Sequence, residues 1–191
     1  MAAATFIDAT DGWLARLARV RERTPAFDGA KLDDIVDYLT FVFVPVLMIV
    51  VMNLVPPAAE GPVAVAVLLA SAYGFAKSDA KTDDYFFTGF PSYWNIVAFY
   101  LVALPTSRTT NAGVLLALVA LVFVRTGYLY PSRTPVLRGL TLALGAVWAV
   151  LVLVAVWQLP APSRPLVAVS LFFPIYYFLL SFYLQSRRAP V

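Results

Sequence analysis

The sequence predicts an all-α membrane protein, a polytopic helical bundle of six complete spans plus the end of a truncated preceding helix. Hydrophobic residues make up 61% of the 191 residues and charged residues only 13%, and the mean hydropathy is +0.81. These values lie outside the range of a water-soluble domain. Apolar runs separated by short polar segments follow residue 34. We therefore expect residues 1–191 to form a single membrane-embedded domain.

The six apolar runs are separated by residues that stop helices. The runs cover residues 35–55, 62–76, 91–106, 112–130, 139–159 and 165–184. A helix needs about 20 residues to cross a bilayer, so the second and third runs must extend into flanking aromatic residues such as Tyr73, Phe75 and Trp94. Proline or glycine at 56–57, 89–91, 131 and 160–162 predicts short hairpins between antiparallel helices.

Composition also excludes several kinds of chemistry. The chain has no cysteine and no histidine, which rules out disulfides, thiol nucleophiles and imidazole catalysis. Any metal must be held by oxygen ligands. The formal charge of +3 does not indicate nucleic-acid binding, because the basic residues are spread over short loops.

The distribution of basic residues predicts an orientation. If the loop before the first complete span is cytoplasmic, that side receives twelve of the 14 Lys and Arg residues, and only Arg108 and Arg164 fall on the other side. This bias places the chain in the inner membrane, with the C-terminus and the reactive face in the cytoplasm. The twelve residues are Arg16, Arg19, Arg21, Arg23, Lys31, Lys77, Lys81, Arg125, Arg133, Arg138, Arg187 and Arg188.

Four aspartates near the N-terminus are spaced to share helix faces. Asp8 and Asp11 stand at i and i+3, and Asp33 and Asp37 stand at i and i+4. Two antiparallel helices joined by residues 17–28 would bring both pairs together. Four carboxylates this close repel one another, so divalent cations are expected between them. Hard oxygen ligands suit Mg²⁺ or Mn²⁺.

Residues beside these acids suit a phosphate. Gly12 and Gly29 have no side chain where a diphosphate could approach the backbone, and Arg16 offers a planar donor fork. Together with the acids they indicate a pyrophosphate site.

The pattern D-x2-D-G-x2-A-R-x12-G-x3-D-x3-D, from Asp8 to Asp37, resembles the signature of the CDP-alcohol phosphatidyltransferase family. The family usually has eight residues between the arginine and the second glycine, whereas this chain has twelve. The longer loop is similar to the phosphatidylcholine synthase branch. Residues 83–100, from Asp83-Asp-Tyr-Phe-Phe-Thr-Gly onward, also resemble a segment of that branch.

The resemblance implies an activity and a set of site residues. Asp8, Asp11, Asp33 and Asp37 would bind the metal, and Asp37 would also be the general base. The CDP moiety would be lined by Gly12, Ala15, Arg16 and Gly29. The substrates would be CDP-diacylglycerol and choline, and the products phosphatidylcholine and CMP. Homodimers are usual in the family.

Other interpretations of the same residues remain open. The acceptor could be serine, or the chain could be a transporter or a non-catalytic membrane scaffold. Asp33 and Asp34 could simply favour the positive end of a helix dipole. Lys77 and Lys81 could attract phosphate or mark the cytoplasmic side.

The aromatic residues around the loop between the second and third apolar runs, here called the second loop, have two interpretations as well. They could form an interfacial belt, or they could surround a quaternary ammonium group, with Tyr38 as an additional candidate. These residues are Tyr85, Phe86, Phe87, Tyr93 and Trp94.

Only seven residues precede Asp8. The family resemblance implies one complete span and most of a second before the first aspartate. Either Met1 is an internal methionine of a longer protein from which two spans are missing, or the chain is a shortened variant, and we expect the first.

Overall fold

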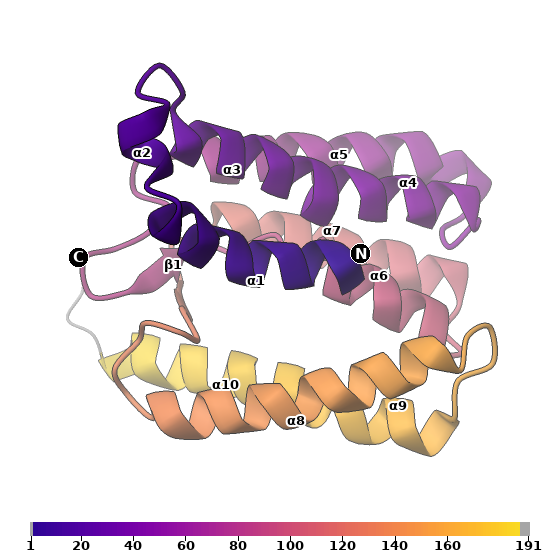
Figure 1. Cartoon of the computed structure of the whole chain (residues 1–191). Helices are drawn as coiled ribbons and strands as arrows, with labels where there is room; N and C mark the ends of the chain where they lie inside the picture. Colours follow the sequence, from indigo (N-terminus) through magenta and orange to yellow (C-terminus); the bar gives the residue numbers. More distant parts are fainter. Residues whose placement is uncertain (1, 188–191) are drawn as a thin grey trace.

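The computed structural model describes residues 2–187 as a bundle of helices with one small sheet (Figure 1). Arg188, counted above among the basic residues, lies outside the described residues. The elements are α1 (Ala2–Leu17), α2 (Val20–Arg23), α3 (Gly29–Asp37), the π-helical segment η1 (Tyr38–Phe43), α4 (Val44–Val51), α5 (Pro57–Ala76), β1 (Phe86–Thr88), α6 (Trp94–Ala103), α7 (Arg108–Phe123), β2 (Gly127–Leu129), α8 (Arg138–Trp157), α9 (Arg164–Ser170) and α10 (Phe172–Arg187).

Within residues 2–187, four helices are long and apolar enough to cross a membrane. They are Gly29–Val51, which joins α3, η1 and α4, then α5, α8, and Arg164–Arg187, which joins α9 and α10. The expectation of a helical membrane bundle is confirmed. The other two expected spans are shorter, because α6 has 10 residues and α7 has 16, or about 15 and 24 Å of helix.

The start of α5 differs from the one expected. Helix α5 begins at Pro57, five residues before the expected start at residue 62. Proline suits the first helical position because its missing N–H needs no partner there, so Pro57 starts a helix where a turn was expected. Glu60 therefore lies in the first turn of α5.

A two-stranded antiparallel sheet interrupts the fourth apolar run. Strand β1 pairs with β2 in the register Phe86↔Leu129, Phe87↔Tyr128 and Thr88↔Gly127. Residues up to 130 were expected to be helical, but helix α7 ends at Phe123. The sheet ties the loop after α5 to the loop after α7 at the end of the bundle where α2 lies (Figure 1).

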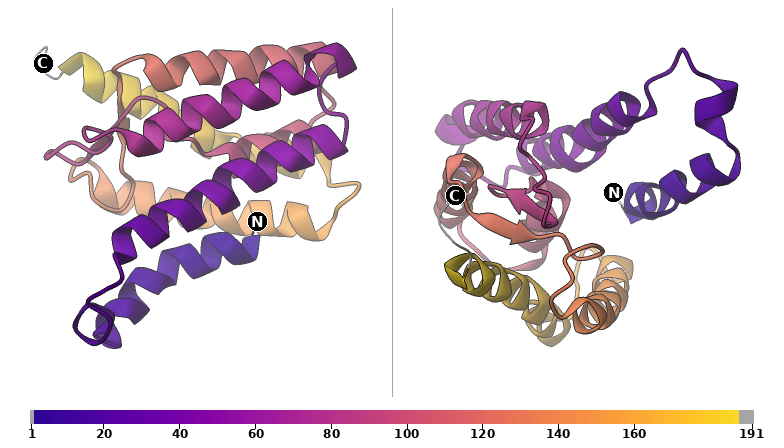
Figure 2. Two further views of the ribbon diagram at one scale, coloured as in Figure 1. Left: turned by 90° about the horizontal axis from the view of Figure 1, so that it is seen from above. Right: turned by 90° about the vertical axis from the view of Figure 1, so that its left-hand side faces the viewer.

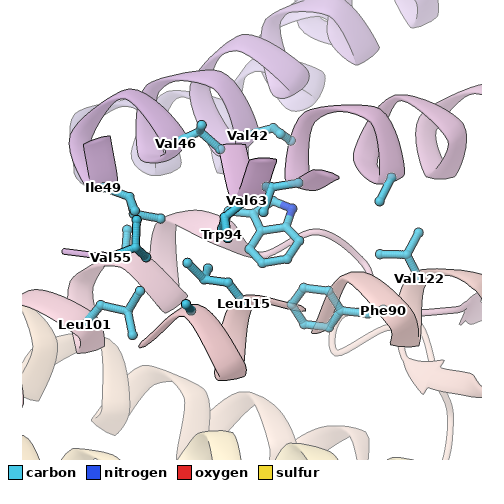
Figure 3. Close-up of a cluster of buried hydrophobic side chains, with 14 of the residues drawn as sticks. Val42, Val46, Ile49, Val55, Val63, Phe90, Trp94, Leu101, Leu115 and Val122 are labelled. Atoms are coloured by element: carbon cyan, nitrogen blue, oxygen red, sulfur yellow. The ribbon is translucent and has the colours of Figure 1, made fainter. Parts of the chain in front are cut away.

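The main core surrounds Trp94 at the start of α6 (Figure 3). Its indole is fully buried and donates from Nε1 to Ser71 Oγ of α5 at 2.7 Å. Side chains from α4, α5 and α7 pack around it, including Val46, Val63 and Leu115. This packing fixes α6, although the helix is short.

A second buried contact joins α6 to the C-terminal helices by hydrogen bonds. Ser170 Oγ donates to the Val167 carbonyl at 2.8 Å, so in the 2.9 Å contact between Tyr100 and Ser170 the tyrosine hydroxyl is the donor. The same hydroxyl accepts from Trp148 Nε1 at 3.0 Å. Tyr100 therefore connects α6, α8 and α9.

Replacing Tyr100 with phenylalanine should lower the free energy of unfolding by about 1–3 kcal/mol, because the Trp148 N–H loses its acceptor inside the bundle. Thermal unfolding in detergent measures the change. Tyr183→Phe is the matched control, because Tyr183 is exposed on α10, and its effect should stay within about 0.5 kcal/mol. Equal stability of the two variants would contradict this role for Tyr100.

The N-terminal elements stand apart from the bundle. Helices α1 and α3, joined through α2, form a hairpin that projects to one side (Figure 2). Helix α1 carries exposed apolar side chains such as Phe6, Trp13 and Leu17. Asn95 of α6 reaches this helix, since its Nδ2 lies 3.5 Å from Thr5 Oγ1.

Candidate metal centre

The hairpin brings the two pairs of aspartates together. One carboxylate oxygen from each of Asp8, Asp11 and Asp33 lies within 4.8 Å of the other two. Asp8 and Asp11 come from α1, and Asp33 comes from α3. Helical spacing places each pair on one face, and the reversal through α2 turns the faces toward each other.

Asp37 is the fourth member of this group. Its carboxyl forms a hydrogen bond with that of Asp8, and the charges of Asp33 and Asp11 also act on it. Two carboxyls can share a hydrogen bond only if one carries a proton. A divalent cation can replace that proton and bind the same oxygens.

The pKa of Asp8 reflects the crowding of these carboxyls. Loss of water around the carboxyl raises the pKa of Asp8 above its ordinary value, and the Asp11 and Asp33 carboxylates raise it further. The hydrogen bond with Asp37 and the positive charge of Lys81 lower it in part. Carboxyls that crowd together and lack enough counter-charge fit a cation site made of oxygen ligands.

Asp28, and not Asp33, caps the N-terminus of α3. Asp28 accepts hydrogen bonds from the backbone N–H groups of Ala30 and Lys31 at 3.2 and 3.3 Å. Asp33 lies a full turn further along and faces α1. This geometry argues against the alternative in which Asp33 only stabilises the end of the helix, because Asp28 fills that role.

The residues expected at the nucleotide lie beside the acids on the same hairpin. A Cβ at Gly12 would meet Arg16 Nη1 at 3.4 Å, so the guanidinium lies along this face of α1. A Cβ at Gly29, the first residue of α3, would meet nothing within 4 Å. Ala15 is exposed. All four positions are thus open to a ligand.

The structure separates the two lysines that the sequence left equivalent. Lys77 is engaged, because its Nζ lies 3.5 Å from Asp79 Oδ1 and 5.8 Å from the centre of the Tyr73 ring. Lys81 faces the aspartates, and its charge acts on Asp8, Asp33 and Asp37. A β-bridge to Phe87 fixes its backbone. No sequence pattern distinguishes the two lysines.

The aromatic residues of the second loop do not act as one group. Trp94 and Phe86 are buried in the core, so neither belongs to an interfacial belt. Tyr85 is exposed. Phe87 and Tyr93 are half-buried and pack edge to face, with ring centres 6.4 Å apart. Tyr38 of η1 donates from its hydroxyl to the Leu68 carbonyl of α5 at 2.9 Å, so its side chain packs η1 against α5.

The chain matches no family model, but its relatives are consistent with one another. Phosphatidylcholine synthase of Legionella pneumophila subsp. pneumophila is 39% identical over 190 residues, which cover 96% of this chain and 74% of that protein. Phosphatidylcholine synthase of Legionella bozemanae is 48% identical over 128 residues, 66% of this chain and 59% of that protein. The phosphatidylcholine synthase of Borreliella burgdorferi is 31% identical, with 80% and 65% covered. The chain therefore belongs to the phosphatidylcholine synthase family of enzymes.

Proposed function

We propose that this protein transfers a phosphatidyl group from CDP-diacylglycerol to choline, forming phosphatidylcholine and CMP. The observation that carries the proposal is the group of carboxylate oxygens from Asp8, Asp11 and Asp33 within 4.8 Å, with Asp37 hydrogen-bonded beside it. The similarity to phosphatidylcholine synthases supports phosphatidylcholine as the product.

The chain's own residues would divide the reaction between them. Asp8, Asp11, Asp33 and Asp37 would hold a divalent cation through carboxylate oxygens. Arg16 would donate to phosphate oxygens of the CDP moiety, and Gly12, Ala15 and Gly29 would leave room for the nucleotide. Bound Mg²⁺ or Mn²⁺ would neutralise the diphosphate and polarise its phosphorus–oxygen bonds.

Asp37 would act as the general base. It would accept the proton of the choline hydroxyl while the choline oxygen forms a bond to the phosphorus that bears diacylglycerol. The bond from that phosphorus to CMP then breaks. A base beside three further carboxylates would lie close to both the acceptor and a cation-bound diphosphate.

The proposed orientation puts this chemistry in the cytoplasm at the inner membrane. The cytoplasmic assignment rests on the basic residues, since Lys77, Lys81, Arg133 and Arg138 belong to segments at the end of the bundle where α2 and β1 lie (Figure 1). A homodimer remains part of the proposal, from the family resemblance alone.

The acceptor is tested by incubating the purified protein with CDP-diacylglycerol and either labelled choline or labelled serine. Thin-layer chromatography should show label in phosphatidylcholine only. Incorporation of serine alone would replace choline by serine as the acceptor, and no labelled lipid from either alcohol would favour the transporter or scaffold alternative.

Removing divalent cations with EDTA should reduce lipid formation to background, and Mg²⁺ or Mn²⁺ should restore it. Asp11→Asn should raise the Mg²⁺ concentration for half-maximal turnover about tenfold or more, because one charged ligand becomes neutral. Asp28→Asn is the matched control, since asparagine caps a helix equally well and Asp28 is outside the grouped acids. Full turnover in EDTA would exclude the metal.

A further inference from the structure

One polar atom at the junction of α1 and α6 has no partner among the described residues. Asn95 Oδ1 is buried without a hydrogen bond, while its Nδ2 donates to Thr5 Oγ1 at 3.5 Å. Thr5 precedes Asp8 by three residues on α1, so the two share a face. The unpartnered oxygen therefore lies on the side of α6 that meets the acid-bearing helix.

Tyr93 precedes Asn95 by two residues, at the N-cap of α6. Tyr177 donates its hydroxyl proton to the Leu129 carbonyl at 3.0 Å, and its ring packs edge to face with Tyr93, with ring centres 6.0 Å apart. The Tyr93 ring thus contacts α10 on the core side. Phe87 holds the ring from another side at 6.4 Å, and the charge of Asp8 acts on Tyr93.

The groups that face this junction share one property. Asn95 Oδ1 is an acceptor, the Tyr93 ring offers a negative π face, and Asp8 is a carboxylate. All three present negative charge or electron density, so together they suit a cation rather than an anion. A quaternary ammonium has no N–H to donate, and aromatic faces and nearby oxygens attract its positively charged methyl surface.

We infer that Tyr93 and Asn95 form the subsite for the trimethylammonium group of the acceptor alcohol. This inference rests on the proposed function, because it places the acceptor's head beside α6 and its hydroxyl toward Asp37. Trp94 lies between the two residues in sequence, but its indole is in the core, where Ser71 binds it. The buried tryptophan anchors the turn that presents its two neighbours.

Two other cationic groups, Lys81 in the loop after α5 and Arg133 in the loop after β2, are engaged elsewhere. Arg133 lies over the Tyr130 ring, with Cζ 5.8 Å from the ring centre, and Tyr130 in turn packs on Phe87 at 4.7 Å. Lys81 faces the aspartates of α1 and α3. A substrate carboxylate such as that of serine would meet the Asp8 carboxylate and the unpartnered Asn95 oxygen at this junction.

The test uses the full chain with CDP-diacylglycerol and labelled choline, and it includes tetramethylammonium as a competitor that carries only the cationic head. Tyr93→Leu and Asn95→Leu should each raise the KM for choline and the inhibition constant of tetramethylammonium about tenfold. The KM for CDP-diacylglycerol should change less than about twofold. Tyr93→Phe keeps the ring, so its choline KM should stay within about threefold of the wild-type value.

Asn111→Leu serves as the structural control. Asn111 Nδ2 binds the Leu54 carbonyl at 2.8 Å, in the loop after α4, so this variant should lower the yield of folded protein and leave the choline KM unchanged. If wild type forms phosphatidylcholine but both leucine variants keep normal values for choline and tetramethylammonium, the subsite is wrong and the proposed function stands. If wild type forms none, the proposed function itself fails. If Tyr93→Leu does not fold, Asn95→Leu decides alone.

Discussion

Replacing Asp37 with asparagine is expected to lower turnover by about 10²- to 10⁴-fold, the usual contribution of a general base. An amide cannot accept the hydroxyl proton, and it also removes a charge from the group formed with Asp8, Asp11 and Asp33. Insertion into the membrane should persist, because the apolar helix that follows is unchanged. Initial rates with labelled choline at saturating Mg²⁺ measure the effect.

Asp34→Asn is the control for this prediction. Asp34 is the next residue after Asp33 on α3, points to another side of the helix, and is outside the group whose oxygens lie within 4.8 Å. Its variant should retain turnover within about twofold, as exposed substitutions usually do. If Asp37→Asn were as active as Asp34→Asn, Asp37 could not be the base.

Replacing Gly89 with alanine is expected to lower the free energy of unfolding by about 3–5 kcal/mol. Gly89 has φ +83°, and a Cβ there would lie 2.3 Å from the Val122 carbonyl oxygen of α7. The left-handed backbone alone disfavours alanine by about 1–2 kcal/mol, and the overlap with backbone can be relieved only by moving β1 away from α7. The melting temperature in detergent should fall by about 10 °C or more.

Gly113→Ala provides the matched comparison. Gly113 lies in α7, where an added Cβ would meet nothing within 4 Å, so this variant should be as stable as the wild type or up to about 1 kcal/mol more stable. If Gly89→Ala had the same melting temperature as Gly113→Ala, the loop after β1 would be able to shift freely.

The sequence predicted the local geometry of the site because helical periodicity is a short-range property. Spacings of three and four residues place Asp8 with Asp11 and Asp33 with Asp37, and the polar residues 17–28 allow the reversal between the two helices. Six apolar runs were likewise predicted to be membrane spans, and within residues 2–187 four of them form long apolar helices. Both inferences need only neighbours along the chain.

Features that depend on distant partners could not be predicted in this way. The pairing of Phe86 with Leu129 joins segments more than 40 residues apart, and no pattern within either strand names the other. The difference between Lys77 and Lys81 arises from the ion pair of Lys77 with Asp79 and from the bridge at Phe87. Asn95, a polar residue in the first turn of an otherwise apolar helix, was visible, but its unpartnered oxygen was not.

The π-helical segment η1 has a geometric consequence for the residues on either side of it. In an uninterrupted α-helix, Asp37 and Val46, nine residues apart, would point about 180° away from each other. Each wider turn of η1 holds one more residue than an α-turn, and one extra residue rotates the following side chains by about 100°. Thr40 Oγ1 donates to the Val36 carbonyl beside this segment, at 2.8 Å. The widened turn thus changes the direction in which side chains point along one continuous helix. Val46 can pack in the bundle while Asp37 points toward a different neighbour, α1.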